Sequence, residues 1–186
     1  MLALGEAMRI AFCGSHRTGK STLVEALAAV LPGYAAVDEP YHAMVEGGYE
    51  FNHPPSLEDF EAQLAHSIES LAEGERDVLL DRCPLDFLAY IAADEAADEF
   101  DFEEWLPRVR AAVGSLDLIV FVPIEAPDRI VFAASDDDGE SRALVDEKLR
   151  EILIEDSFEL GVNALEVEGS VETRVESVLK AIPRRR

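Results

Sequence analysis

The sequence predicts an α/β fold in which a parallel β-sheet carries helices on both faces. Short apolar runs alternate along the chain with amphipathic helical patterns, which is typical of repeated β-α units. The apolar runs are continuous rather than alternating in polarity, as expected for strands that are buried on both faces. With 186 residues and 48% hydrophobic content, the chain is expected to form a single domain over residues 1–186.

The first predicted strand, Ile10–Cys13, leads directly into a phosphate-binding motif. Residues 14–21 read Gly-Ser-His-Arg-Thr-Gly-Lys-Ser and match the pattern G-x-x-x-x-G-K-[ST]. Glycines let consecutive backbone N–H groups approach a phosphate, while the lysine carries positive charge to it and the serine offers a hydroxyl to Mg²⁺. The expected nucleotide-binding residues are Gly14, Ser15, His16, Arg17, Thr18, Gly19, Lys20, Ser21 and Thr22.

The helical pattern directly after this motif disfavours a chance match. Apolar residues from Leu23 to Leu31 recur on one helical face, and Pro32-Gly33 ends that pattern. Strand, loop and helix therefore come in the order that phosphate binding requires, and we expect a nucleoside triphosphate as the ligand.

Four more strands are predicted, and polar motifs follow two of them. Ala35–Val37 precedes Asp38-Glu39-Pro40, and Asp77–Leu80 precedes Asp81-Arg82. In a parallel sheet ligands bind at the carboxyl ends of the strands, where these motifs lie. The other two predicted strands span Leu116–Ile124 and Val162–Val167, and the further predicted helices span Leu57–Glu73, Asp86–Glu99, Phe102–Val113, Glu140–Leu160 and Val171–Ile182.

The charge of the chain restricts its partners. With 16 basic and 39 acidic residues the formal net charge is −23, which repels nucleic acids and anionic membranes. The basic run at residues 184–186 is interpreted as a solvated tail. We therefore expect a small-molecule partner, with no nucleic acid and no membrane, and a homodimer is left open.

Cysteine usage and the N-terminus favour a cytoplasmic protein. Cys13 and Cys83 have no C-x-x-C partner, and we expect both to be reduced core residues. Residues 1–7 lack the basic start and apolar stretch of a signal peptide.

The motifs together resemble those of the small P-loop kinase-like ATPases. The phosphate loop, Asp-Glu-Pro after the second strand and Leu-Leu-Asp-Arg-Cys-Pro-Leu-Asp-Phe-Leu-Ala-Tyr after the third are similar to the nicotinamide riboside kinase domain of NAD-biosynthesis proteins. More distantly, they resemble deoxyribonucleoside kinases and thymidylate kinase. The resemblance implies a three-layer P-loop fold with a five-stranded parallel sheet in the order 2-3-1-4-5. It also implies ATP and Mg²⁺ as cofactors and phosphoryl transfer to a small acceptor.

The resemblance suggests catalytic roles for residues at the strand ends. Glu39 matches the general base of the deoxyribonucleoside kinases, with Asp38 as the fallback. Asp81 would serve Mg²⁺ together with the loop serine, because a carboxylate at the end of a buried strand is costly unless it meets a cation. Arg82 resembles the arginine that orients the acceptor and the transferring phosphoryl group. Asp86 would contact substrate or cap the helix after it.

An acceptor site is expected between the second and third strands. Aromatic surface and an amide that would suit a nucleobase or nicotinamide are offered there by Tyr41, His42, Tyr49, Phe51, Phe60 and Gln63, although a core aromatic cluster is the equal alternative. Beyond the fourth strand, residues 125–145 are expected to form a lid, in which Arg142 would act in catalysis and Arg129 would cover the nucleotide. The acidic run 136–138 is no calcium loop, because carboxylates are missing at the first and twelfth positions.

These features are compatible with three functions. The leading hypothesis is a Mg-ATP-dependent kinase that phosphorylates a hydroxyl of a nucleoside-like acceptor, with nicotinamide riboside or a deoxynucleoside as examples. The second is a regulatory ATPase module with slow hydrolysis, which the small number of lid arginines favours. The third is a nucleoside monophosphate kinase, which needs more positive charge at the acceptor end than the sequence provides.

Overall fold

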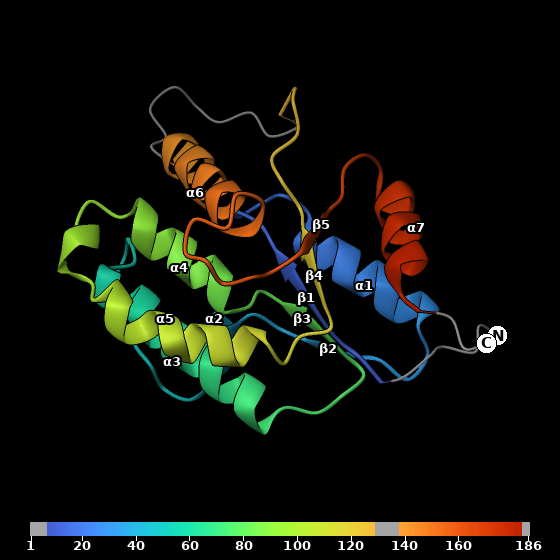
Figure 1. The fold of residues 1–186 in the computed structure, drawn as a ribbon, viewed down its shortest axis with the longest axis horizontal. Coiled ribbons are helices and arrows are strands. Elements are labelled where there is room, and N and C mark those ends of the chain that lie inside the picture. Colours follow the sequence, from blue (N-terminus) through green and yellow to red (C-terminus); the bar gives the residue numbers. More distant parts are fainter. Residues whose placement is uncertain (1–6, 129–137, 184–186) are drawn as a thin grey trace.

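The computed structural model describes residues 7–128 and 138–183 and contains a five-stranded parallel sheet. The strand order is β2-β3-β1-β4-β5, so both the predicted fold class and the predicted order are confirmed (Figure 1). The strands are β1 (Arg9–Cys13), β2 (Ala35–Val37), β3 (Val78–Asp81), β4 (Leu118–Phe121) and β5 (Ala164–Glu166).

Helices cover both faces of the sheet. Two helices, α1 (Lys20–Val30) and α7 (Val171–Ala181), pack on one face (Figure 1). The other face carries α3 (Leu57–Glu73), α4 (Pro84–Ala93), α5 (Phe102–Val113) and α6 (Asp138–Leu153). Two short elements, α2 (Pro40–Glu46) and the 3₁₀ turn η1 (Ala97–Glu99), complete the described chain.

The alternation of side chains along β1 divides the core into two apolar clusters. Ile10 and Phe12 pack with residues of α1 and α7, whereas Ala11 and Cys13 pack with residues of α4 and α6. Successive strand residues point to opposite faces, so a strand that is apolar throughout can support both layers. This explains why the continuous apolar runs in the sequence predict a doubly covered sheet.

The register of the strands brings the functional motifs to one edge. Phe12 pairs with Asp81 on one side and with Val120 on the other. The phosphate loop after β1, the Glu39 region after β2 and Arg82 after β3 therefore leave the sheet at the same end. Among the described residues, no helix is long and apolar enough to cross a membrane.

The largest differences from the predicted elements concern three helices. The helix expected over Asp86–Glu99 starts earlier, at Pro84, and ends at Ala93, because the next residue takes an extended conformation. The helix expected to reach Leu160 ends at Leu153, followed by Asp156 with a φ of 53°. The helix α2 was missed; it begins with a proline at its first position, a common helix start.

Candidate functional site

The backbone of the phosphate loop requires glycine at two positions, Gly14 and Gly19. A Cβ on Gly14 would lie 2.5 Å from the carbonyl oxygen of Val122, which directly follows β4, so the backbone there leaves no room for a larger residue. Gly19 has a φ of 91°, which favours glycine, and Arg17 adopts a φ of 58° at the tip of the loop. Helix α1 begins at Lys20, so its N-terminal N–H groups face the space that the loop encloses.

Lys20 is held inside the loop with its charge poorly solvated. Its Nζ donates to the carbonyl oxygen of Ser15 at 2.7 Å, and the residue is 5% exposed. Burial, together with the positive charge of Arg82, lowers the pKa of Lys20 to about 8, although nearby carboxylates oppose this shift. A bound phosphate would supply the negative charge that this buried ammonium group needs.

Ser21 and Asp81 form a pair that could hold a cation. The Ser21 hydroxyl donates to Asp81 Oδ2 at 2.5 Å. The second carboxylate oxygen of Asp81, Oδ1, is buried and has no hydrogen-bond partner within the described part of the chain. A carboxylate and a hydroxyl at the mouth of a phosphate loop are the oxygen ligands that Mg²⁺ prefers, so these two residues fit the predicted metal role.

Arg82 and Glu39 form an ion pair at the end of β3. Arg82 Nε donates to Glu39 Oε2 at 2.6 Å, and its Nη1 donates to the carbonyl oxygen of Gly14 at 3.3 Å. Burial raises the pKa of the Glu39 carboxyl, but Arg82 and Lys20 outweigh burial and lower it overall. Glu39 is therefore ionised at neutral pH. Arg82 has a φ of 81°, a strained conformation for a non-glycine residue that is often found at functional sites.

Asp86 fastens the phosphate loop to α4 and does not face a ligand. It is fully buried, and its two carboxylate oxygens accept the N–H groups of Gly14 and Cys83, both at 3.0 Å. Arg82 Nη1 lies 3.5 Å from the same carboxylate. Of the two roles that the sequence left open, the structure thus provides the capping one, and no contact between Asp86 and a substrate is expected.

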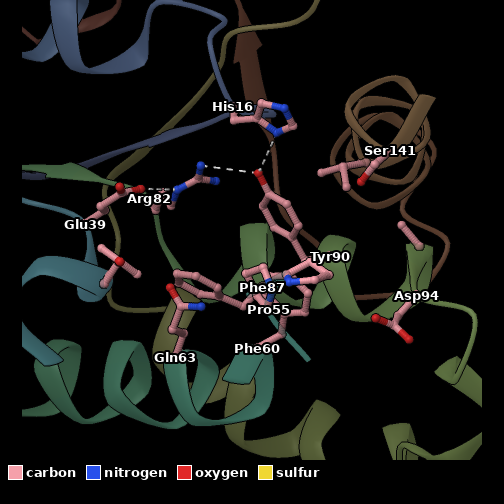
Figure 2. A pocket seen from close by; sticks show the side chains of 14 residues that line it. His16, Glu39, Pro55, Phe60, Gln63, Arg82, Phe87, Tyr90, Asp94 and Ser141 are labelled. Atoms are coloured by element: carbon pink, nitrogen blue, oxygen red, sulfur yellow. Dashed lines mark hydrogen bonds and ion pairs between the residues drawn. The ribbon is translucent and has the colours of Figure 1, made fainter. Parts of the chain in front are cut away.

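A cavity of about 460 Å³ lies beside this ion pair. Glu39 and Arg82 stand at one end of it and Asp94 at the other (Figure 2). Of the side chains predicted for the acceptor, Tyr41, Phe60 and Gln63 line it, whereas His42, Tyr49 and Phe51 are not among its lining residues. The remaining lining residues are His16, Pro54, Pro55, Phe87, Tyr90, Ala93, Ser141 and Val145.

Aromatic side chains form the wall of this cavity. The rings of Phe60 and Tyr90 stack at a centroid distance of 5.0 Å with 18° between their planes. The Tyr90 hydroxyl also accepts from Arg82 Nη2 at 3.3 Å and approaches His16 (Figure 2). The Gln63 amide donates to the carbonyl oxygen of Asp59 at 3.3 Å. The sequence left open whether the predicted aromatic residues form a binding surface or a core cluster. In the structure Phe60 does both, because it packs against Tyr90 and also lines the cavity.

Some of the predicted lid residues lie outside the part of the chain that the structure describes. Arg129 lies outside the described residues, as do Asp136 and Asp137. Arg142 is 2% exposed and braces the phosphate loop from α6: its Nε donates to the carbonyl oxygen of His16 at 2.8 Å, and it pairs with Asp128. The Ser15 hydroxyl in turn donates to the carbonyl oxygen of Arg142 at 2.9 Å. In this arrangement Arg142 shapes the loop and is not among the residues that line the cavity of about 460 Å³.

A second cavity of about 190 Å³ lies on the outer side of the phosphate loop. Arg17, Thr18, Gly19 and Thr22 line it from the loop and α1. On its far side, Gly169 lines it from the segment after β5. This cavity is a candidate site for the base of a nucleotide whose phosphates occupy the loop.

Sequence reasoning missed Arg174 and Tyr90. Arg174 Nη1 donates to the carbonyl oxygen of Thr18 at 2.8 Å, and its Nη2 donates to Glu125 at 2.9 Å. A signal was present, because Arg174 falls three residues after Val171 and four before Val178, on the apolar face of α7. Tyr90 is the last residue of the motif that follows the third strand. It lies four residues after Asp86 and thus on the same helical face.

Comparisons with known proteins agree with this architecture. A family model described as an AAA domain matches residues 9–174, whereas no curated protein matches the sequence. Deoxyadenosine kinase from M. mycoides with bound dATP is similar, with a TM-score of 0.64 and 16% identity over 94% of this chain and 98% of that chain. Thymidylate kinase from Candida albicans is similar with a TM-score of 0.65 and 17% identity, over 94% of this chain and 90% of that chain. The NadR protein in complex with NAD and AMP-PNP is similar with a TM-score of 0.64 and 18% identity, over 97% of this chain but only 51% of NadR. The predicted resemblance to small P-loop kinase-like proteins is confirmed.

Replacing Asp86 tests whether it fastens the loop. Asp86→Ala would leave the buried N–H groups of Gly14 and Cys83 without an acceptor, and each lost acceptor costs about 1–3 kcal/mol. We expect the free energy of unfolding in urea to fall by roughly 2–5 kcal/mol. The exposed Asp98 provides the control, since Asp98→Ala should stay within about 0.5 kcal/mol of the original protein. Equal stabilities of the two variants would contradict the role of Asp86.

Proposed function

Because the chain belongs to the AAA domain family, we propose that it is a Mg-ATP-dependent kinase that transfers the γ-phosphoryl group to a hydroxyl of a nucleoside-like small molecule. The observation that carries this proposal is the position of the Glu39–Arg82 pair. It stands between the phosphate loop, through the Arg82 contact with Gly14, and a separate cavity lined with aromatic side chains. A protein that only hydrolyses ATP does not require an acceptor site, and the cavity of about 460 Å³ would then have no role.

Each residue of the pair has a chemical task in this proposal. Glu39 is an ionised carboxylate and would accept the proton of the attacking hydroxyl, or orient that hydroxyl toward the γ-phosphorus. Arg82 would hold Glu39 in place and stabilise negative charge on the transferring group. Lys20 would neutralise the β and γ oxygens from within the loop.

Ser21 and Asp81 are the residues that would hold Mg²⁺. The unpaired buried oxygen of Asp81 supports this assignment, because a buried carboxylate oxygen is costly without a partner. The ion would neutralise charge on the phosphates as it develops. Asp81 would bind it directly or through water.

The charges of the acceptor cavity favour a nucleoside over a nucleoside monophosphate. Among the described residues that line it, Arg82 is the one with a permanent positive charge, and Glu39 already neutralises it. Asp94 at the far end would repel a phosphate (Figure 2). A flat base on the wall formed by Phe60 and Tyr90, with the Gln63 amide nearby, fits these groups.

Slow ATP hydrolysis for regulation is the second candidate. The placement of Arg142 supports it, since this side chain is engaged with loop carbonyl groups rather than aimed at the acceptor cavity. A missing transition-state arginine lowers turnover by roughly three to five orders of magnitude in related chemistry. The two candidates differ in whether an acceptor receives the phosphoryl group.

One assay separates these candidates. The purified protein is incubated with γ-labelled Mg-ATP and a panel of nucleosides, nicotinamide riboside and nucleoside monophosphates, and both labelled product and free phosphate are followed. We expect label on a hydroxyl of one nucleoside-like acceptor. Label on a monophosphate would contradict the proposed acceptor class, and phosphate release with no labelled acceptor would favour the regulatory ATPase.

Glu39→Gln is expected to slow phosphoryl transfer while leaving ATP binding nearly unchanged. The amide keeps the shape of the side chain but cannot take the proton, and loss of a general base lowers rates by about 100-fold or more. Steady-state transfer to the acceptor found in the panel gives the rate, and calorimetry gives the affinity for Mg-ATP. Asp38→Asn is the matched control, because it alters the adjacent exposed carboxylate. A Glu39→Gln rate equal to that of the original protein would remove Glu39 as the base.

Affinity for Mg-ATP is expected to fall as the pH rises above about 8. Lys20 in the free protein loses its proton near this pH, whereas a bound triphosphate favours the protonated form. Binding above pH 8 must therefore restore the proton, which weakens affinity by up to about tenfold per pH unit. Calorimetry in buffers of different ionisation enthalpy should detect the proton taken up. A constant affinity between pH 8 and 10.5 would contradict this position of the Lys20 pKa.

A further inference from the structure

Cys13 and Cys83 lie in contact beneath the phosphate loop. Their sulfur atoms are 3.3 Å apart, and the two residues are 0% and 1% exposed. Cys13 is the last residue of β1 and directly precedes Gly14; Cys83 directly follows Arg82 and is the N-cap of α4. Neither thiol has a task in the proposed phosphoryl transfer, and the redox chemistry of the pair does not depend on that function.

The backbone around the two thiols already suits a disulfide. They follow neighbouring parallel strands, in which Phe12 pairs with Asp81 and the Arg82 N–H donates to the carbonyl oxygen of Phe12 at 3.1 Å. Neighbouring strands run about 4.8 Å apart, and Cys83 lies one residue beyond the position opposite Cys13. This spacing is of the same order as the Cα separation of roughly 4.4–6.8 Å that disulfides span. Because an S–S bond is about 2.05 Å long, the two sulfur atoms must approach by about 1.2 Å.

We propose that Cys13 and Cys83 form a reversible disulfide when a small hydroperoxide reaches them, and that this bond lowers the nucleotide affinity of the phosphate loop. With hydrogen peroxide, the Cys83 sulfur attacks one peroxide oxygen, the O–O bond breaks and the other oxygen leaves as water. The Cys13 sulfur then attacks the resulting sulfenic sulfur, the S–O bond breaks and a second water leaves. Two thiols lose two electrons and two protons, and the peroxide is reduced to two waters.

The surroundings distinguish the attacking thiol from the resolving one. Cys83 stands at the N-terminus of α4. Cys83 also lines a cavity of about 130 Å³ between α2 and α3, which is large enough to hold a small peroxide. Cys13 is 0% exposed and is not among the residues that line this cavity, so it serves as the resolving thiol and gives up its proton to the departing water as it attacks. The hydrogen bond with Cys83, burial and the nearby Asp86 raise the pKa of Cys13, which disfavours it as the first thiol to react.

The bond would act directly on the loop. Asp86 joins the Gly14 N–H to the Cys83 N–H, and Arg82 contacts the Gly14 carbonyl oxygen, so the two cysteines border the contacts that fix the loop. In well-ordered catalytic sites, a displacement of about 1 Å can lower the reaction rate by roughly 100-fold, so a shift of this size at the loop is expected to matter. We expect the oxidised protein to bind Mg-ATP at least tenfold more weakly than the reduced protein.

Mass spectrometry of the intact chain tests the bond without any assay of activity. The reduced protein is treated with hydrogen peroxide, the peroxide is removed with catalase, and the denatured chain is alkylated with N-ethylmaleimide. We expect a mass lower by two hydrogen atoms and no alkyl group, and dithiothreitol should restore labelling of both cysteines. In Cys13→Ala, dimedone should trap a sulfenic acid on Cys83, whereas in Cys83→Ala, Cys13 should remain unlabelled by dimedone.

Three results would overturn the inference. The first is a peroxide-treated native chain that still accepts two alkyl groups, and the second is a sulfinic acid on Cys83 with Cys13 free. The third is equal Mg-ATP affinity of the oxidised and reduced protein in calorimetry. If the reduced protein bound no nucleotide, the proposed kinase would fail while the mass measurement would still decide the disulfide.

Discussion

The contacts of one buried carboxylate hold the candidate site together. Asp86 accepts an N–H from the first residue of the phosphate loop and another from the start of its own helix, and Arg82 lies beside it. Burial raises the pKa of this carboxyl, which means that its ionised form is costly in the fold. Two N–H donors and a guanidinium offset that cost. The loop, the acceptor-side arginine and α4 are thereby fixed relative to one another.

Fixing these three segments matters for the proposed phosphoryl transfer, because that reaction depends mainly on positioning. The transition state is loose, and the protein contributes by placing donor, acceptor and charges rather than by forming bonds to them. The strained φ angles of Arg17 and Arg82 are consistent with a backbone that the surroundings hold in place. Arg142 and Arg174 add to this by binding carbonyl groups of the loop from α6 and α7. Helices from both faces of the sheet thus converge on one loop.

The sequence predicted the sheet and the loop well because these depend on local and periodic signals. Continuous apolar strands and the spacing of Gly14, Gly19 and Lys20 leave few alternatives. The side-chain roles at the loop were less predictable. Arg142 and Arg174 bind backbone carbonyls from segments more than one hundred residues away, as shown by separations of 126 and 156 positions. Such partners are set by packing of the layers, which no local pattern records.

The distribution of charge explains how so acidic a chain could bind a polyanion. Its formal net charge is −23, yet Lys20, Arg142 and Arg174 are each at most 6% exposed and all contact the loop. Surface charges are screened over about 8 Å at physiological ionic strength, whereas buried charges act through a medium of low dielectric constant. A phosphate in the loop would therefore experience the near, buried cations more strongly than the distant acidic surface. A long nucleic acid would meet that surface along its length, and for this reason we propose a small nucleotide rather than a polymer as the ligand.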